Sequence, residues 1–235
     1  MIIRIFDIFL SGIALVVLLP LMIPIMIGLK LTGEHYVFYL QPRVGKGGEI
    51  FNVFKFATML KNSPNLSGGC ITQSKDPRVL PMGHFLRKTK INELPQLLNI
   101  LVGQMSVVGP RPIVAQHWAL YPKKSREAIM KMTPGLTGIA SLVFRDEEGV
   151  LDRIGGDRKY VHDKVIAPFK GELELWWFEH CTIMNYFKLI FLTMWSLVSP
   201  RTSLWKKWFK DLPDPPKELK IGIWPTRRSN HGCYS

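Results

Sequence analysis

A long apolar run near the start of the chain is its clearest pattern. From Ile8 to Leu29 no side chain is charged, with Arg4 and Asp7 before the run and Lys30 after it. This length approaches what is needed to cross ~30 Å of hydrocarbon, so we expect a membrane element. No small-residue cleavage site follows the run, which predicts that the segment is not a removable signal peptide.

Two prolines, Pro20 and Pro24, fall in the second half of this run. Each removes a backbone donor and clashes with the carbonyl one turn back, so the pattern predicts a bend rather than a straight helix. Two outcomes are open on these residues. The helix either spans the membrane with a kink, or turns within it and re-emerges on the side it entered.

The next segments predict a small β-element followed by helices. Residues 36–39 and 50–56 are rich in aromatic and β-branched residues, and a glycine-rich turn at 45–48 separates them, so a hairpin is expected. Residues 62–69 read as a loop, and irregular chain continues to a helical start near His84. Leucines at 94, 97, 98 and 101 predict an amphipathic helix after Pro95.

The second half of the chain is predicted to be mainly helical. We expect a short helix over 125–132, an extended segment over 136–144, and helices over 157–198 that are broken near Pro168 and Cys181. The aromatic-rich end of this stretch fits either a core helix or a helix lying in the head-group plane. A basic aromatic patch at 206–210 follows, and the proline-rich remainder from Pro213 is expected to pack poorly.

Charge and cysteine content narrow the partners and the compartment. The formal charge of +13 predicts anionic partners. Because the chain has an apolar run, we expect these partners to be acidic lipids. Nucleic acid is not expected, since attachment to a membrane is the simpler explanation of the basic residues. Positive charge near a membrane segment favours the cytoplasmic side. Three widely spaced cysteines suggest neither a disulfide framework nor a zinc site.

A charged site is suggested by Glu93, which stands just before the predicted helix with Arg87 and Lys90 nearby, and by Arg111, which lies between two prolines. A guanidinium on a stiff backbone suits bidentate binding of phosphate. On residue types alone, the other interpretation stays open. In it, residues 87–90 form a solvated basic face and the prolines around Arg111 form a rigid turn.

Several motifs, taken in order, resemble the bacterial sugar transferase family of small monotopic phosphoglycosyl transferases. The resemblance reaches to about Thr193, and its pieces are the proline-broken apolar run, residues 41–45 (QPRVG), 55–59 (KFATM), 87–96 (RKTKINELPQ), 105–112 (MSVVGPRP) and 133–138 (TPGLTG). It implies transfer of a phospho-sugar from a UDP-sugar to undecaprenyl phosphate at the cytoplasmic face, with release of UMP. It also implies an α+β, helix-rich monotopic membrane protein, held by a re-entrant helix and by interfacial amphipathic helices.

The resemblance carries roles to matching residues. Glu93 would be a catalytic carboxylate that helps to bind Mg²⁺, Arg87 and Arg111 would hold phosphate, and Lys55 would lie near the diphosphate. Hard oxygen ligands and substrate phosphates are what Mg²⁺ prefers. The chain departs from the family at Ala57, where relatives carry a further cation, which predicts an altered choice of nucleotide or sugar.

Asn92 is the larger departure, because it stands where the family has its nucleophilic aspartate. An amide oxygen carries no charge and is a poor nucleophile. Three explanations compete: Glu93 or another acid acts instead, Asn92 is deamidated or tolerated, or the chain is a silent relative that still binds its ligands. Asp146 and Glu147 are candidates for the missing carboxylate, although residues 144–148 also fit a solvated loop.

We therefore expect an enzyme of the bacterial inner membrane that initiates a surface glycan. The predicted domains are a membrane-inserted helix at 1–32, a catalytic domain at 33–200 and a basic, proline-rich tail at 201–235. The partners implied are a UDP-sugar, undecaprenyl phosphate, anionic lipids and downstream glycosyltransferases, and a homodimer is left open. The rival is a non-catalytic membrane adaptor that binds polyprenyl phosphate or a nucleotide sugar and recruits glycosyltransferases.

Overall fold

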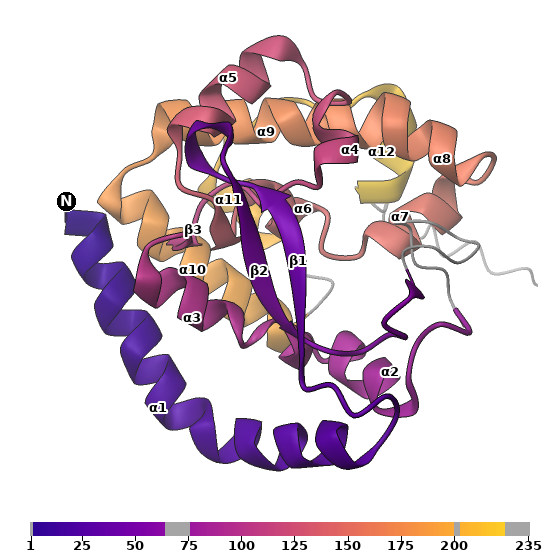
Figure 1. The fold of residues 1–235 in the computed structure, drawn as a ribbon. Helices are drawn as coiled ribbons and strands as arrows, with labels where there is room; N and C mark the ends of the chain where they lie inside the picture. The colour runs from indigo at the N-terminus through magenta and orange to yellow at the C-terminus, as the bar shows by residue number, and fades with distance from the viewer. Residues whose placement is uncertain (1, 64–75, 200–202, 224–235) are drawn as a thin grey trace, which may run out of the picture. The chain divides into compact units, whose positions relative to one another are not determined.

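The computed structural model describes residues 2–63, 76–199 and 203–223, and the chain divides into two compact units. The first unit comprises Met1–Gly45 and Glu49–Val107, and the second comprises Lys46–Gly48 and Val108–Ser235. In chain order the first unit contains α1 (Ile2–Leu31), β1 (Phe38–Val44), β2 (Ile50–Phe56), α2 (Pro81–Lys88), the 3₁₀ helix η3 (Ile91–Glu93) and α3 (Gln96–Val102) (Figure 1). The short strand β3 (Ser106–Val108) crosses the boundary between the units.

The predicted hairpin is confirmed. β1 and β2 pair antiparallel, with Tyr39 opposite Lys55 and Val44 opposite Ile50. The one-turn helix η1 (Lys46–Gly48) connects them, and the backbone N–H of Gly45 donates to the carbonyl of Glu49 at 2.7 Å. The first strand runs on to Val44, beyond its predicted end at residue 39, because the aromatic pattern marks only the start of the paired region.

The N-terminal helix α1 is continuous through both of its prolines and bends, as expected; in Figure 1 the indigo ribbon turns part-way along its length. The second half of α1 is packed. Met22, Ile25 and Leu29 form a buried cluster with Phe56 of β2 and Leu86 of α2. This cluster is part of the hydrophobic core of the first unit, so the prolines bend a helix whose far end is fixed by apolar burial.

The other end of α1 is fixed by polar contacts with the same unit. The Arg4 guanidinium donates to the carbonyl oxygens of Ile100 and Leu101, at the C-terminal end of α3, and the bond to Leu101 is 2.7 Å. The buried Asp7 carboxylate accepts from the Ser106 hydroxyl at 3.0 Å and from the Val107 backbone N–H at 2.8 Å. Both ends of the helix are therefore tied to residues of the first unit.

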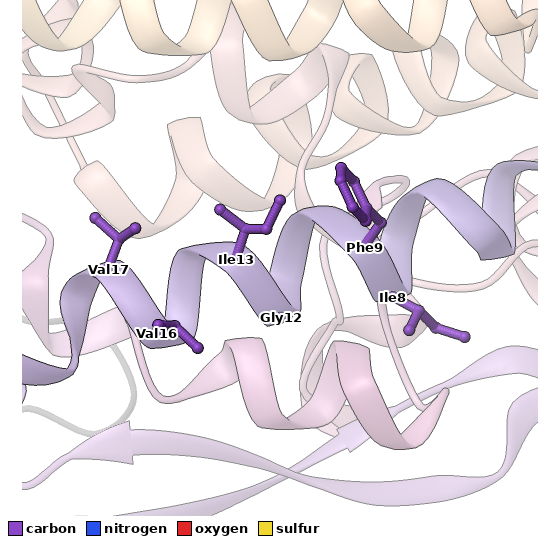
Figure 2. A pocket seen from close by; sticks show the side chains of 6 residues that line it. All are labelled: Ile8, Phe9, Gly12, Ile13, Val16 and Val17. Carbon is purple, nitrogen blue, oxygen red and sulfur yellow. The ribbon is translucent and has the colours of Figure 1, made fainter.

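Between these ends the surface of α1 is apolar and open. Figure 2 shows a shallow groove beside Gly12, lined only by side chains of α1: Ile8, Phe9, Ile13, Val16 and Val17. Val16 is 74% exposed and Phe9 is 63% exposed, values that are unusual for such side chains in water. By length and composition, α1 is a helix that could cross a membrane.

The second unit is almost entirely helical. Its elements, in chain order, are α4 (Ala115–Trp118), α5 (Lys123–Lys131), β4 (Gly135–Thr137), α6 (Ile139–Val143), α7 (Glu147–Ile154), α8 (Arg158–Val161), the π-helix η4 (His162–Ile166), α9 (Ala167–His180), α10 (Ile183–Val198), α11 (Leu204–Trp208) and α12 (Lys217–Ile223). The predicted helix near residues 125–132 is confirmed as α5. Phe169, Leu173 and Trp177 of α9 are each 1% exposed, which makes α9 the centre of this unit.

The extended segment predicted over 136–144 is wrong. Only β4 is extended, and the chain then turns at Gly138 into α6, where Leu142 donates its N–H to the Gly138 carbonyl at 2.9 Å. Ile139, Ala140, Leu142 and Val143 are all buried. A short run of apolar residues buried all round has the same composition whether it is helical or extended, so the pattern could not distinguish the two.

The break predicted near Pro168 is also wrong, whereas the one at Cys181 is confirmed. The helix continues through Pro168 into α9, and the wider π-turn of η4 comes immediately before it. A π-turn inserts one extra residue, so its backbone hydrogen bonds join residues five apart instead of four. This change comes just before Pro168, which has no N–H to donate to the helix. After Cys181, which has an extended backbone, Thr182 caps α10 by accepting from the Asn185 N–H at 3.2 Å.

The helices after residue 182 agree only in part with the sequence-based expectations. α10 has a buried stripe at Tyr186, Leu189 and Leu192 and a broad exposed apolar face, formed by Ile183, Met184, Phe187, Phe191, Met194, Trp195, Leu197 and Val198. Part of the segment from Pro213, which was expected to pack poorly, forms α12, where Leu219 is 0% exposed, and residues 224–235 of that segment lie outside the described residues. α12 packs against α7 and η4, which explains why this part of the segment is helical. The basic aromatic patch is divided, because Trp205 and Phe209 are buried while Trp208 is 40% exposed. Residues 64–75 of the predicted loop lie outside the described residues.

Candidate active site

A tight connection between α2 and α3 carries the two residues that the sequence analysis placed first. Lys90 has φ +62°, a left-handed conformation rarely adopted by side-chain-bearing residues, and its carbonyl accepts from the Glu93 N–H at 3.0 Å. The helix η3 then leads through Pro95 into α3. Strained backbone of this kind persists only where the surroundings fix it, and it holds Asn92 and Glu93 in the turn between two helices.

Asn92 is buried, with 8% of its surface exposed, and its side-chain oxygen has no hydrogen-bond partner among the described residues. The side-chain nitrogen of Gln96, which is 2% exposed and lies four residues further on, likewise has none. A buried polar atom without a partner costs about 1–3 kcal/mol, so such positions call for an explanation. Glu93 differs from both, since its side chain is only partly buried.

Lys55 lies on β2 and reaches across the hairpin. Its ammonium donates to the Gln41 side-chain oxygen at 3.0 Å, and the Arg43 guanidinium donates to the same oxygen at 2.7 Å. The Gln41 oxygen thus binds two cations, Arg43 from its own QPRVG motif and Lys55 from the KFATM motif. Ala57, where the resemblance predicts a cation, is 6% exposed and bonds through its N–H to the Val37 carbonyl at 2.9 Å.

Arg87 is positioned by an unusually close helix contact. A Cβ atom at Gly83 would lie 2.1 Å from the Thr58 carbonyl oxygen, so α2 can approach the end of the KFATM motif only because residue 83 is glycine. Leu80 donates its N–H to that same carbonyl at 2.9 Å. Arg87, in the last turn of α2, has its guanidinium 3.5 Å from the Met59 sulfur. Lys55, Arg87, Asn92 and Glu93 all belong to the first unit.

Mg²⁺ would meet a suitable but sparse set of ligands in this unit. No group of three His, Cys, Asp or Glu side chains that could hold a metal ion occurs among the described residues. Glu93 supplies one carboxylate, and the partnerless oxygen of Asn92 is a second hard donor next to it in the chain. Mg²⁺ is commonly held by one or two carboxylates together with substrate phosphates, so these residues fit the ion.

Arg111 belongs to the second unit and is held by backbone pairing. Gly109 donates its N–H to the Thr137 carbonyl, and Gly135 donates to the Pro110 carbonyl, each at 2.8 Å. A Cβ atom at Gly135 would lie 2.1 Å from the Gly109 nitrogen, so both motifs need glycine for this approach. The predicted rigidity of the Arg111 segment is therefore real, and the Arg111 side chain is exposed.

Glu174 contacts the backbone of Arg111 and was missed by the sequence analysis. It lies on α9, is 3% exposed, and accepts a hydrogen bond from the Arg111 backbone N–H. Burial raises the pKa of Glu174 to about 8, against the smaller opposing effects of the Arg111 N–H and of Lys170. Its second oxygen has no partner among the described residues. One signal could have found it, namely an acid between Leu173 and Leu175, just before the apolar run at 176–178.

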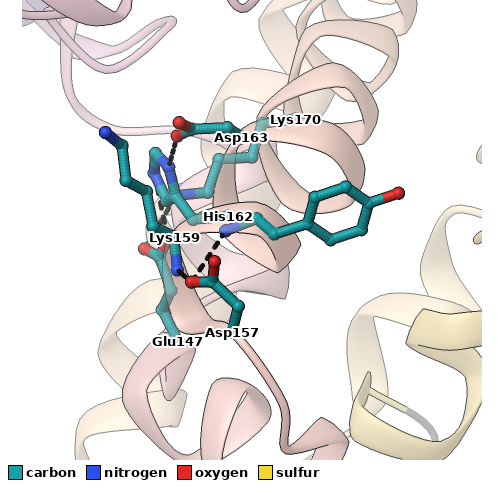
Figure 3. A network of polar contacts seen from close by, with 7 residues as sticks. Glu147, Asp157, Lys159, His162, Asp163 and Lys170 are labelled. Carbon is teal, nitrogen blue, oxygen red and sulfur yellow. Dashed lines mark hydrogen bonds and ion pairs between the residues drawn. The ribbon is translucent and has the colours of Figure 1, made fainter.

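Asp146 and Glu147 lie at the start of the helix α7. One interpretation of the sequence predicted a solvated loop at residues 144–148. Asp146 caps the helix, accepting from the Gly149 N–H at 3.2 Å and pairing with Arg153 at 3.2 Å, and its side chain is 65% exposed. Glu147 is more deeply placed and pairs with Lys170 at 2.7 Å, with a ring nitrogen of His162 at 3.8 Å (Figure 3).

The charge state of Glu147 follows from its neighbours. Burial alone raises the pKa of Glu147, but the ion pair and hydrogen bond with Lys170, assisted by His162 and Arg111, outweigh it and leave the pKa below its ordinary value. His162 also contacts Asp163, at 2.7 Å. Glu147 is thus an ionised carboxylate beside Arg111 and Lys170, whereas Glu174, on the same unit, is protonated at neutral pH.

Comparison with known proteins adds a consistent result. A model of the bacterial sugar transferase family matches residues 1–200. The exopolysaccharide production protein ExoY of Sinorhizobium fredii is 36% identical over 174 residues, which cover 68% of this chain and 76% of ExoY. A putative undecaprenyl-phosphate N-acetylgalactosaminyl 1-phosphate transferase of Bacillus subtilis is 43% identical over 149 residues, covering 63% of this chain and 80% of that protein. The UDP-glucose:undecaprenyl-phosphate glucose-1-phosphate transferase of Xanthomonas campestris pv. campestris is 41% identical over 146 residues, covering 60% of this chain and 30% of that longer enzyme.

Proposed function

Since the chain belongs to the bacterial sugar transferase family and is a phosphoglycosyl transferase, we propose that it transfers a sugar-1-phosphate from a UDP-sugar to undecaprenyl phosphate, releasing UMP. The observation that carries this proposal is the family match over residues 1–200, which includes every motif on which the resemblance rests. Two of the relatives are named for sugar-1-phosphate transfer to undecaprenyl phosphate, and one of them for UDP-glucose as donor. ExoY is named for exopolysaccharide production, which suggests that the product initiates a surface glycan.

The residues of the first unit have the chemistry that this reaction needs. Lys55 and Arg87 supply cations for the donor diphosphate, and their backbones are fixed by the hairpin and by the close contact at Gly83. Glu93 would hold Mg²⁺ together with substrate phosphates, and the ion would neutralise charge on the diphosphate as UMP departs. Arg111, presented on the rigid segment of the second unit, is proposed as a further phosphate-binding residue.

Asn92 determines the route that we propose for the transfer. An oxygen of the acceptor phosphate attacks the phosphorus that carries the sugar, and the bond from that phosphorus to the bridging oxygen breaks, so that UMP leaves. No phospho-sugar forms on residue 92, because a carboxamide oxygen is not an effective nucleophile. Asp146 and Glu147 remain candidates for a carboxylate in a two-step route, and a covalent adduct on either residue would support that alternative.

The fold favours a re-entrant α1 over a spanning one. Asp7 is bonded to Ser106 and Val107, and Leu29 is packed with Phe56 and Leu86, all within the first unit. A helix that spans places its two ends on opposite sides of ~30 Å of hydrocarbon. The attachment of both ends to one compact unit therefore supports a monotopic arrangement with both flanks on the cytoplasmic face of the inner membrane. Cysteine labelling before Arg4 and after Lys30 from each side tests this, and a span would label them from opposite sides.

The exposed apolar face of α10 supports an additional contact with the leaflet. Met194 is 64% exposed and Val198 is 84% exposed, and Phe191 stacks on both Trp195 and Trp208 at ring-centre distances of 6.2 and 5.3 Å. Aromatic side chains of this kind favour the interface between head groups and acyl chains. We propose that α10 lies in this plane and that the surrounding lysines contact anionic lipids.

The experiment that tests the function is transfer of labelled sugar phosphate into undecaprenyl phosphate, with a panel of UDP-sugars and Mg²⁺ present. We expect UMP release and labelled lipid with the wild type, and loss of both in Glu93→Gln. Glu148→Gln, which changes an exposed acid of α7, is the matched control and should keep wild-type activity. Binding of UDP-sugar without turnover across the panel would contradict the proposal and favour the non-catalytic adaptor.

A further inference from the structure

Asn99 of α3 is fully buried and has a partner for every hydrogen-bonding atom of its side chain. Its oxygen accepts from the Phe54 backbone N–H at 2.9 Å, and its nitrogen donates to the Asn52 carbonyl and to the Gln104 side-chain oxygen, each at 2.8 Å. We propose that Asn99 is a positioning residue for the transferase reaction, which fixes Lys55 on β2 relative to the Asn92–Glu93 turn. This inference rests on the proposed function.

The bonds of Asn99 replace those of a missing strand. β1 covers one edge of β2, and peptide groups alternate in direction along a strand, so Asn52 and Phe54 turn theirs toward the other edge. Among the described residues the sheet has only two strands, which leaves that edge without a strand partner. The Asn99 carboxamide offers one acceptor and one donor to residues 54 and 52, as a peptide unit of a third strand would.

The same residue fixes the helix that follows the catalytic turn. The Asn99 carbonyl accepts from the N–H groups of Gln104 at 3.0 Å and Met105 at 3.1 Å, which closes the C-terminal end of α3. A helix of seven residues, such as α3, is marginal by itself and depends on tertiary contacts. Asn99 thus secures both the helix that starts just after Glu93 and the strand that carries Lys55.

Register explains why this matters for chemistry. Lys55 follows Phe54 directly, and moving a strand by one residue transfers every side chain to the opposite face. The bond from Phe54 to Asn99 excludes such a slip and holds the Lys55 ammonium on the face where it meets Gln41. Asn99 is 0% exposed and so acts by holding Lys55 in place relative to the Asn92–Glu93 turn rather than by touching substrate.

The test is a double-mutant cycle between Asn99→Asp and Lys55→Gln. Aspartate has the shape of asparagine and still accepts from Phe54, but it loses both donors and sets a carboxylate oxygen against two carbonyl oxygens. We expect Asn99→Asp to lower kcat/KM by about 10- to 100-fold in the wild type, since small misplacements have effects of this order. In the Lys55→Gln background it should lower kcat/KM by less than about threefold, because the residue that it positions is gone.

A general loss of folding is separated from positioning by Leu173→Ala, which removes a buried side chain of the second unit. Its effect on kcat/KM should be the same factor in both backgrounds. Equal factors for Asn99→Asp in both backgrounds, or wild-type kinetics in that variant, would overturn the proposal. An inactive wild type would refute the proposed function instead. In that case hydrogen exchange at the Phe54 amide still tests Asn99, since Asn99→Leu should speed the exchange, and unchanged protection would overturn the inference.

Discussion

Asn99 in the first unit and Glu174 in the second are both buried polar side chains, but they differ in how completely their polar atoms are hydrogen-bonded. Each atom of the Asn99 carboxamide that can form a hydrogen bond has a partner. Glu174 accepts from Arg111, yet its second oxygen has no partner among the described residues, and its pKa is raised to about 8. A fully bonded amide stabilises the fold, whereas a neutral buried acid keeps a donor that the fold does not use.

The difference separates residues that build the scaffold from residues that the scaffold holds at a cost. The Asn92 oxygen and the Gln96 nitrogen resemble Glu174 in this respect, and both lie in the segment 87–96, for which the resemblance predicts a catalytic role. Unpaired buried atoms lower stability, so their presence at such a segment suggests that function maintains them. Substitutions at the two kinds of residue should therefore differ in how they change stability and activity.

The largest effect is expected for Glu174→Gln, and it depends on pH. Below pH 4.5 the carboxyl is protonated in both states; between 4.5 and about 8 the unfolded chain releases the proton and the folded protein keeps it. The wild-type free energy of unfolding should therefore fall as pH rises through this window, by about 1 kcal/mol per pH unit from this group. Glu174→Gln removes that dependence, so its Tm should rise relative to the wild type between pH 5 and 8. Glu172→Gln, an exposed acid on the same helix, is the control, and parallel Tm curves for the wild type and Glu174→Gln would contradict the assignment.

Asn99→Ala should have the next largest effect on stability. It removes the hydrogen bonds of the Asn99 side chain to the Phe54 N–H and to the Asn52 carbonyl, both of which are part-buried, at a cost on the order of 2 kcal/mol for the two together. Urea unfolding measures this loss. Gln104→Ala is the matched control, because it removes only one of the three side-chain partners of Asn99 and should lower stability by less. Equal losses in the two variants would show that the strand contacts carry little of the energy.

Glu147→Gln should have a smaller effect, present above the ordinary carboxyl pKa and lost at low pH. The folded-state pKa of Glu147 is lowered, so its stabilising contribution is present above the ordinary carboxyl pKa and is lost as pH falls through the folded value. The pair with Lys170 is partly exposed, with 30% and 17% of the two side chains accessible, which limits the expected loss to about 1 kcal/mol. Thermal unfolding at pH 7 and pH 3 measures it, and a difference from the wild type that persists at pH 3 would exclude the ion pair as its cause. Glu148→Gln is the control.

Asn92→Leu should have the smallest effect on stability and an opposite effect on activity. Replacing a buried acceptor that lacks a partner by an apolar side chain of similar size is expected to change the free energy of unfolding by less than about 1 kcal/mol in either direction. Transfer activity should nevertheless be lost, because the oxygen next to Glu93 is gone. A variant that is active, or one that is strongly destabilised, would place Asn92 with Asn99 among the scaffold residues.

Regular patterns made much of the first unit predictable. The hairpin, the bend in α1 and the helix after Pro95 follow from turn glycines, prolines and leucine spacing, and the family match confirms the resemblance. The helix α2 was expected near His84 and starts three residues earlier, at Pro81, since a proline suits the first turn of a helix. Local signals were sufficient where one face of an element is buried and the other is exposed.

Long-range contacts account for what the sequence did not reveal. The helix α6 is buried on all sides, so its composition carried no period, and α12 is ordered by Leu219 against a distant helix. Glu174 and Asn99 were missed because their roles depend on partners at Arg111 and Phe54, far from them in the chain. The roles proposed for Lys55, Arg87, Asn92, Glu93, Arg111, Asp146 and Glu147 remain predictions.

The most direct test of the account is a rapid-quench experiment with UDP-sugar labelled in the sugar-linked phosphate, on the wild type and on Asn92→Asp. With donor and Mg²⁺ but no acceptor, the wild type should carry no protein-bound label, whereas Asn92→Asp should acquire it. With undecaprenyl phosphate added, the wild type should form labelled lipid and release UMP. Protein-bound label on the wild type would contradict direct transfer and identify another nucleophile, and an inactive wild type rescued by Asn92→Asp would show that this chain has lost the transferase activity.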